Sequence, residues 1–128
     1  MFDLYDDVAT QKVLTEIAGA NKVIGAVCHG PAALINTKLP DGSLLLEGCT
    51  VNGFPHRDEA VFGTPEMLPF RLETELRRVM GPKGKFEMSS EPLGECVTID
   101  RGGKLVMGQN PASVAEVAKA VMAAASNN

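Results

Sequence analysis

The segment 23–32, VIGAVCHGPA, constrains the fold more than any other part of the sequence. It begins with small or β-branched apolar residues, which are typical of a strand that is covered on both faces. A cysteine follows at once, and the glycine and proline after it indicate a sharp turn into a helix. The segment therefore predicts a buried strand that ends at Cys28 and continues into a helix over residues 29–36.

Two interpretations of Cys28 stay open at this point. Cysteine is among the most frequently buried residues, and one at the end of a strand is often a packing residue. The free N–H groups of a helix N-terminus, however, stabilise a thiolate, and the small residues Ala26 and Gly30 leave room for a sharp turn. His29 adds an imidazole beside the thiol, which a packing cysteine does not need. These neighbours favour an exposed, reactive cysteine.

The composition predicts one domain over residues 1–128, because a chain of this length with 45% hydrophobic residues can bury a single core. A net charge of −4 with scattered basic residues argues against nucleic-acid binding. No apolar run is long enough to cross a membrane, and the N-terminus lacks the basic flank of a leader. The three cysteines have no CxxC spacing, which predicts free thiols and a cytoplasmic or nuclear location.

Helical and strand patterns alternate along the chain. The expected elements are a helix over 7–20, the strand over 23–27, the helix over 29–36, an apolar run at 44–46, a β-prone segment at 49–52, a short helix over 55–63, a helix between Pro69 and Gly81, a hairpin of strands at 96–99 and 104–107, and a final helix capped by 108–111. The expected inner faces carry Val8, Val13, Leu14 and Ile17 in the first helix and Val114, Val117, Val121 and Met122 in the last. This alternation predicts an α/β fold with a mostly parallel sheet, whose ligand site lies beyond the carboxyl ends of the strands.

Several motifs, in order along nearly the whole chain, resemble the ThiJ/PfpI superfamily. They are MFDL at 1–4, AVCHGPA at 26–32, NGF at 52–54, Glu59, LPF at 68–70 and GQNPAS at 108–113. The branch that is resembled contains the glutathione-independent glyoxalases (glyoxalase III) and heat-shock-chaperone-like proteins. The resemblance implies a flavodoxin-like three-layer sandwich.

The resemblance also implies the roles of the site residues. Cys28 is the expected nucleophile, His29 its base, and Glu59 the carboxylate that orients the imidazole. Asp58 is an adjacent alternative, and without the resemblance the charged residues 57–59 are typical of a solvated helix start. The elbow formed by Ala26 and Gly30 leaves the backbone N–H of His29 as an oxyanion donor.

Four further residues are candidates for the wall of a pocket, and each is equally consistent with plain core packing or, for the last, with a helix cap. They are Phe54, Pro69, Phe70 and Asn110. The other two cysteines, Cys49 and Cys96, are expected in the core.

The activity implied by the resemblance is the conversion of methylglyoxal to D-lactate, a lyase reaction of the D-lactate dehydratase type, without glutathione, metal or other cofactor. The thiolate adds to the aldehyde, a base moves a proton from C1 to C2 through an enediolate, and hydrolysis of the thioester releases lactate. The expected substrate is a small α-oxoaldehyde.

The chain departs from the family at its start, because members carry a portion before the segment 1–3. That portion supplies sheet strands, an acidic residue that hydrogen-bonds the cysteine, and a loop with a second oxyanion N–H. We therefore expect an open sheet edge beside the strand at 23–27 and impaired activity of the chain alone. A complementing N-terminal fragment or a homodimer is the expected means of completing the sheet.

Three other functions are compatible with parts of the sequence. A holdase chaperone with a redox-sensing thiol is the principal alternative, and a peptidase is a second. A glutamine amidotransferase fits less well, because that family places its histidine and glutamate together late in the chain and no histidine follows His56 here.

Overall fold

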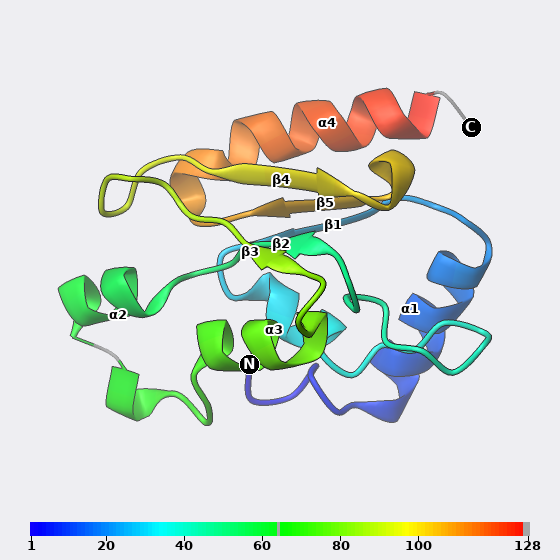
Figure 1. Ribbon diagram of the computed structural model, residues 1–128, viewed down its shortest axis with the longest axis horizontal. Helices are drawn as coiled ribbons and strands as arrows, with labels where there is room; N and C mark the ends of the chain where they lie inside the picture. The colour runs from blue at the N-terminus through cyan, green and yellow to red at the C-terminus, as the bar shows by residue number, and fades with distance from the viewer. Residues whose placement is uncertain (64, 127–128) are drawn as a thin grey trace.

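The chain is built around a three-stranded sheet in the computed structural model, which describes residues 1–63 and 65–126 (Figure 1). The central strand, β5 (Leu105–Gly108), is buried along its whole length. It pairs in parallel with β1 (Ile24–Val27) and antiparallel with β4 (Val97–Asp100). The predicted strand before Cys28 and the predicted hairpin are thereby confirmed. The expected burial of that strand is wrong beyond Ile24, because β1 is an edge of this sheet: Gly25 is exposed, and Ala26 and Val27 are half-buried. The other edge is β4.

A second, smaller sheet consists of β2 (Thr50–Val51) and β3 (Lys85–Phe86), which pair in parallel. Side-chain hydrogen bonds join it to β4. The N–H of Thr50 donates to the Asp100 carboxylate over 2.6 Å, and the Asn52 side-chain amide donates to the carbonyl of Cys96 over 3.0 Å. We call this line of contact between β2 and β4 the seam.

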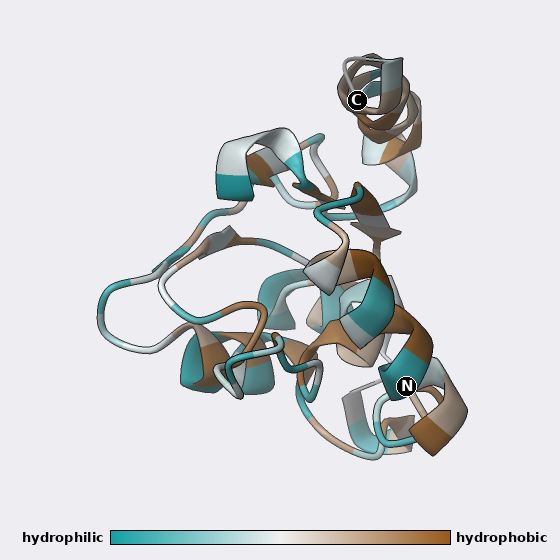
Figure 2. Ribbon diagram, turned by 90° about the vertical axis from the view of Figure 1, so that its right-hand side faces the viewer, coloured by the Kyte–Doolittle hydropathy of each residue, from teal (hydrophilic) through white to brown (hydrophobic). Residues whose placement is uncertain are grey.

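Helices cover both faces of the main sheet, as Figure 1 shows. On one face lies α4 (Val114–Ser126), and on the other lie α1 (Val8–Gly19), α3 (Leu72–Met80) and the 3₁₀ helix η1 (Gly30–Leu34). Shorter elements connect them: α2 (His56–Phe62), η2 (Pro65–Met67), η3 (Arg101–Gly103) and η4 (Pro111–Ser113). Figure 2 shows α4 nearly end-on. The arrangement is the predicted three-layer α/β fold.

The core lies between the main sheet and the helices on the side of α3. Its members are mostly leucine, valine, isoleucine and methionine from β1, β2, β5, α3 and the loops between them: Ile24, Ala32, Leu34, Ile35, Leu45, Leu46, Cys49, Val51, Phe54, Leu72, Leu76, Val79, Met80, Leu105 and Met107. The apolar run at 44–46 forms no strand and instead supplies two of these buried leucines. No helix within the described ranges is both long and apolar enough to cross a membrane.

The first helix begins where its sequence predicts. The Asp7 carboxylate caps α1 by accepting from the N–H of Thr10 over 2.7 Å. The expected inner face is only half correct, however: Leu14 and Ile17 pack against the core, whereas Val8 is 82% and Val13 53% exposed. The helix contacts the core along one narrow stripe, so its other apolar residues face outward.

The last helix shows the same difference. Val117 is buried, and the side chains of Val117 and Val121 approach the sheet where Gly25 and Gly108 leave room for them. Val114 and Met122, also expected on the inner face, are 50% and 70% exposed.

Two further elements differ from the sequence prediction. The helix predicted over 29–36 is the shorter η1, and β3 was not predicted at all.

Candidate active site

Cys28 lies directly after β1 in a left-handed backbone conformation with φ of 63°. Its N–H donates to the carbonyl of Gly108, and its own carbonyl accepts from the N–H of Phe54, both over 2.9 Å. The first bond extends the pairing of β1 with β5 by one residue, and the chain then turns into η1. A non-glycine residue in this region is strained, which is the backbone geometry of a nucleophile elbow.

Gly53 lies beside the elbow, where little space is left between the loop after β2 and two leucines of α3. A Cβ at this position would lie 2.9 Å from the Cδ1 of Leu76 and 3.5 Å from the carbonyl oxygen of Cys28. A Cβ on Gly30 would meet only the Cβ of Ala26, at an ordinary 3.8 Å. The tight contacts of Gly53 are thus with leucine side chains, and the carbonyl of Cys28 lies at an ordinary contact distance.

The side chains of Cys28, His29 and Glu59 form a continuous chain of contacts. The Cys28 Sγ lies 3.4 Å from the Nδ1 of His29, and the His29 Nε2 is hydrogen-bonded to the Oε1 of Glu59. Glu59 is buried, whereas the His29 side chain is 32% exposed. With a proton on Nε2, the imidazole donates to Glu59 and its Nδ1 can accept the thiol proton. The structure thus brings together the three residues that the resemblance singled out.

The electrostatics of this arrangement favour a protonated imidazole. The hydrogen bond with Cys28 is the largest influence and raises the pKa of His29 above 6.5; partial burial opposes it, and the hydrogen bond with Glu59 adds to it. The imidazole ring also lies 4.8 Å from the ring of Phe54, centroid to centroid. The imidazole of His29 is therefore in contact with the thiol, with Glu59 and with the ring of Phe54.

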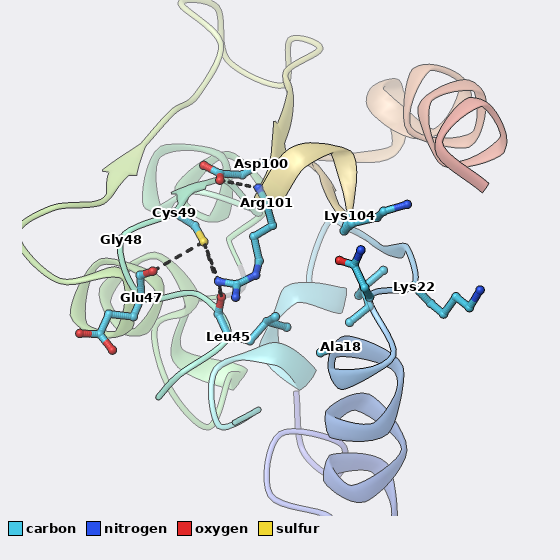
Figure 3. Close-up of a pocket in the computed structure, with 11 residues that line it drawn as sticks. Ala18, Lys22, Leu45, Glu47, Gly48, Cys49, Asp100, Arg101 and Lys104 are labelled. Atoms are coloured by element: carbon cyan, nitrogen blue, oxygen red, sulfur yellow. Dashed lines mark hydrogen bonds between the residues drawn. The ribbon is translucent and has the colours of Figure 1, made fainter. Parts of the chain in front are cut away.

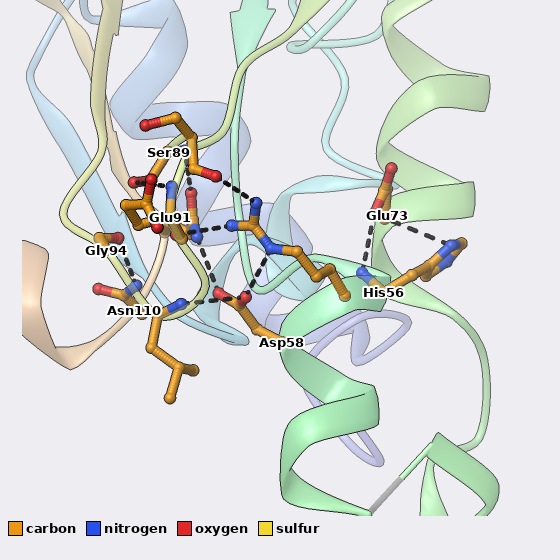
Figure 4. Close-up of polar contacts among 11 residues, drawn as sticks. His56, Asp58, Glu73, Ser89, Glu91, Gly94 and Asn110 are labelled. Atoms are coloured by element: carbon orange, nitrogen blue, oxygen red, sulfur yellow. Dashed lines mark hydrogen bonds and ion pairs between the residues drawn. The ribbon is translucent and has the colours of Figure 1, made fainter.

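Asp58, the alternative partner of His29, is turned away from the imidazole. Its buried carboxylate accepts from the side-chain amide of Gln109 over 2.8 Å and from the N–H of Leu93 over 3.1 Å, as Figure 4 shows in part. The ambiguity between Asp58 and Glu59 is thereby resolved in favour of Glu59 as the residue that contacts His29.

An apolar pocket of about 470 Å³ opens above the thiol and imidazole. Its wall consists of Phe2, Cys28, His29, Phe54, Phe62, Met67, Leu68 and Pro111. Phe54 was predicted in this wall, and Asn110 lines a smaller pocket beside it. Pro69 and Phe70 do not line it; the Phe70 ring packs against Tyr5 at a centroid distance of 5.0 Å instead.

Sequence reasoning missed most of the apolar wall. Phe62 follows Glu59 by three residues on α2, and this helical spacing places the two residues on one side of the helix. That spacing could have identified Phe62. Phe2 and Met67 come from segments far from Cys28 in the sequence, so no local signal connects them with it.

A backbone donor is available next to the thiol. Within the described part of the chain, the N–H of His29 donates to no protein acceptor. As the amide that follows the nucleophile, it is in the position of an oxyanion donor.

The two other cysteines lie outside this site. Cys49 is buried, and burial raises the pKa of its thiol; Figure 3 shows its sulfur directed toward Arg101 in a pocket at the opposite end of β1. Cys96 is only half-buried, so the expectation of a core position is confirmed for Cys49 and not for Cys96. Among the described residues, no group of three or more His, Cys, Asp or Glu side chains could hold a metal ion.

The fold resembles that of the ThiJ/PfpI class of α/β proteins. No family model matches the chain. The solved structures with this fold include the rapid encystment protein of Francisella tularensis, which matches with a TM-score of 0.87 and 32% identity over 97% of this chain and 52% of that one.

The more particular likeness is to glyoxalase III. The glutathione-independent glyoxalase hsp3101 of Schizosaccharomyces pombe is 32% identical over 126 residues, which cover 95% of this chain and 51% of that protein. The crystal structure of glyoxalase III from Candida albicans matches with a TM-score of 0.79 and 28% identity, over 96% of this chain and 52% of that one. The resemblance to this branch is thereby confirmed, and the chain spans about half the length of the curated relatives it matches.

Proposed function

We propose that this chain carries the thiol site of a glyoxalase that converts a small α-oxoaldehyde such as methylglyoxal to D-lactate. The observation that carries the proposal is the contact chain from Cys28 through His29 to Glu59 at the base of an apolar pocket. Among the described residues, the thiol and His29 are the titratable side chains that line this pocket, which suits an uncharged substrate of few atoms.

The bond-forming and proton-transfer steps of the proposed reaction can be assigned to described residues. The Cys28 sulfur forms a bond to the aldehyde carbon, and the aldehyde oxygen takes a proton to give a hemithioacetal. The imidazole of His29 then removes the proton from C1 and returns it to C2 through an enediolate, which yields a thioester. Water cleaves the C–S bond, releasing lactate and regenerating the thiol. The N–H of His29 stabilises the oxyanions, and Glu59 supports the imidazolium.

The chain spans half of its relatives, so two readouts test the proposal. The first is consumption of methylglyoxal and formation of D-lactate by the purified chain. The second, independent of turnover, is protection of Cys28 by methylglyoxal against iodoacetamide, located by mass spectrometry. We expect methylglyoxal to protect Cys28, and we expect turnover by this chain alone to be below that of a full-length relative.

Single substitutions test the role of each residue in the proposed reaction. Cys28→Ala should abolish lactate formation, and Glu59→Gln should lower it by about a hundredfold or more. Cys96→Ala, which removes a half-buried thiol outside the pocket, is the matched control and should leave the rate unchanged. Turnover by Cys28→Ala at the wild-type rate, or equal protection of Cys28 and Cys96, would contradict the proposal. A holdase function would instead survive in Cys28→Ala, measured as suppression of aggregation of an unfolded client.

A further inference from the structure

The helix that carries Glu59 has almost no apolar anchorage. Of the seven residues of α2, all within the described ranges, only Asp58 and Glu59 are buried. The first N–H of the helix, that of His56, donates to the side chain of Glu73 over 2.8 Å. Among the described residues, the one ring contact of α2 with the core is that of Phe62 with Phe54, at a centroid distance of 5.7 Å, and Phe62 stays 61% exposed. The position of α2 therefore depends largely on the polar contacts made by these carboxylates.

Asp58 has the densest set of these contacts. Its Oδ2 accepts from the Nε2 of Gln109 over 2.8 Å, and its Oδ1 accepts from the N–H of Leu93 over 3.1 Å and from the Nε of Arg57 over 3.2 Å. Gln109 is fully buried as well, and its Oε1 accepts from the N–H of Ser89 over 2.8 Å. Figure 4 shows Asp58 at the centre of this network.

The network connects both ends of the contact chain at the site. Gln109 directly follows Gly108, whose carbonyl accepts the N–H of Cys28. Asp58 directly precedes Glu59, which contacts His29. The buried hydrogen bond between Asp58 and Gln109 therefore ties the helix that supplies the carboxylate to the strand that holds the backbone of the nucleophile.

We propose that Asp58 and Gln109 are positioning residues, whose buried hydrogen bond sets the distance between Glu59 and the imidazole of His29. The inference rests on the proposed function, since it assigns these residues a role in the same site. Neither side chain touches the thiol or lines the pocket above it, so both act through Glu59. A buried amide donor left without its acceptor is unfavourable, and α2 would shift to relieve it.

The polarity of the bond permits a rescue experiment. In Asp58→Asn, an amide group faces the Gln109 amide, and in Gln109→Glu, two carboxylates face each other. The double variant Asp58→Asn/Gln109→Glu reverses donor and acceptor: the Asn amide donates to one Glu oxygen, and the other oxygen still accepts from Ser89. The Asn oxygen still accepts from the N–H of Leu93 and from the Nε of Arg57, so each of these hydrogen-bond partners is retained.

The measurements are the pKa of His29 by NMR and the pH profile of Cys28 alkylation by iodoacetamide, both on the folded full chain. We expect each single variant to lower the pKa of His29 and to slow alkylation by about tenfold at neutral pH, and the double variant to restore both. Asp100→Asn is the matched control: it removes a carboxylate that binds the N–H groups of Thr50 and Arg101 far from the site. It should lower stability without changing the titration of His29.

Single variants that fold and keep the wild-type titration and alkylation profile would overturn the positioning role, as would a folded double variant without recovery. A single variant that fails to fold leaves the double variant as the decisive comparison. Failure of the proposed function is separately visible, because the wild-type chain would then neither consume methylglyoxal nor be protected by it at Cys28, whatever the titration of His29 in these variants.

Discussion

At the scale of single residues, Cys28 shows how reactivity opposes stability. Its φ of 63° lies in the region that disfavours any residue with a Cβ, yet hydrogen bonds on both sides of its peptide units hold it there. The same conformation directs the thiol to His29 rather than into the core. The strain is therefore a consequence of where the sulfur must lie.

This strain predicts a stability difference between two variants. Cys28→Gly should be more stable than Cys28→Ala by about 1 kcal/mol, because glycine adopts the left-handed conformation without the steric penalty, even after its greater entropy in the unfolded chain is counted. Equilibrium unfolding in urea measures the difference. Equal stability of the two variants would show that the elbow is not strained.

At the scale of elements, the loop that follows β2 places two residues of the site. Gly53 allows the loop to pass Leu72 and Leu76 closely, so that the N–H of Phe54 reaches the carbonyl of Cys28. The ring of Phe54 then lies against the imidazole. The elbow thus depends on the loop as much as on its own sequence.

We expect Gly53→Ala to destabilise the chain by about 1–3 kcal/mol, because the added Cβ overpacks the space beside the two leucines. It should also slow the alkylation of Cys28, since the loop must withdraw from the elbow. Gly30→Ala is the matched control for stability, and its added Cβ finds ordinary contact, so its free energy of unfolding should stay within about 0.5 kcal/mol of wild type. The reverse order of the two variants would refute the assignment.

The elements that the sequence predicted are those with strong local signals. The helix from Val8 has both an apolar period and the Asp7 cap, and the hairpin has Gly102 and Gly103 at its turn. The two-residue strand β3 has no comparable signal, because only its pairing with β2 defines it. The exposure of Val8 depends on how α1 lies on the core, which a helical period does not specify.

The candidate site likewise contains residues that local sequence signals predict and one that they do not. Cys28 and His29 are neighbours in the sequence, so their contact is a local property that the strand and turn signals predict. Glu59 is thirty residues away, and only the family resemblance distinguished it from Asp58. Tertiary contacts decide which carboxylate reaches His29, because the carboxylate of Asp58 is hydrogen-bonded to the side-chain amide of Gln109 instead.

At the scale of the whole molecule, ionisable groups define the pH range of stability. The folded state raises the pKa of His29, so it binds a proton more tightly than the unfolded chain. This contribution is fully present below about pH 6.5 and is lost as the pH rises through the raised value. The opposite case is Asp7, where the hydrogen bond with Thr10 lowers the pKa of its carboxyl below 3.8. That contribution is lost in acid.

We therefore predict that the free energy of unfolding decreases as the pH rises from about 6.5 through the raised pKa of His29. Cys28→Ala removes the largest cause of the shift, so its stability should decrease less over the same range. Urea unfolding at a series of pH values measures both curves. Parallel curves for the two proteins would show that the thiol does not stabilise the imidazolium.

The two sheets that meet at the seam supply different residues of the candidate site. Cys28 and His29 follow a strand of the main sheet, whereas Phe54 and Glu59 follow a strand of the smaller one. The sulfur–imidazole contact is therefore made within one sheet's connections, whereas the imidazole–carboxylate contact is made between the two sheets. The main sheet by itself would present a cysteine and a histidine, and only its association with the smaller sheet supplies the carboxylate.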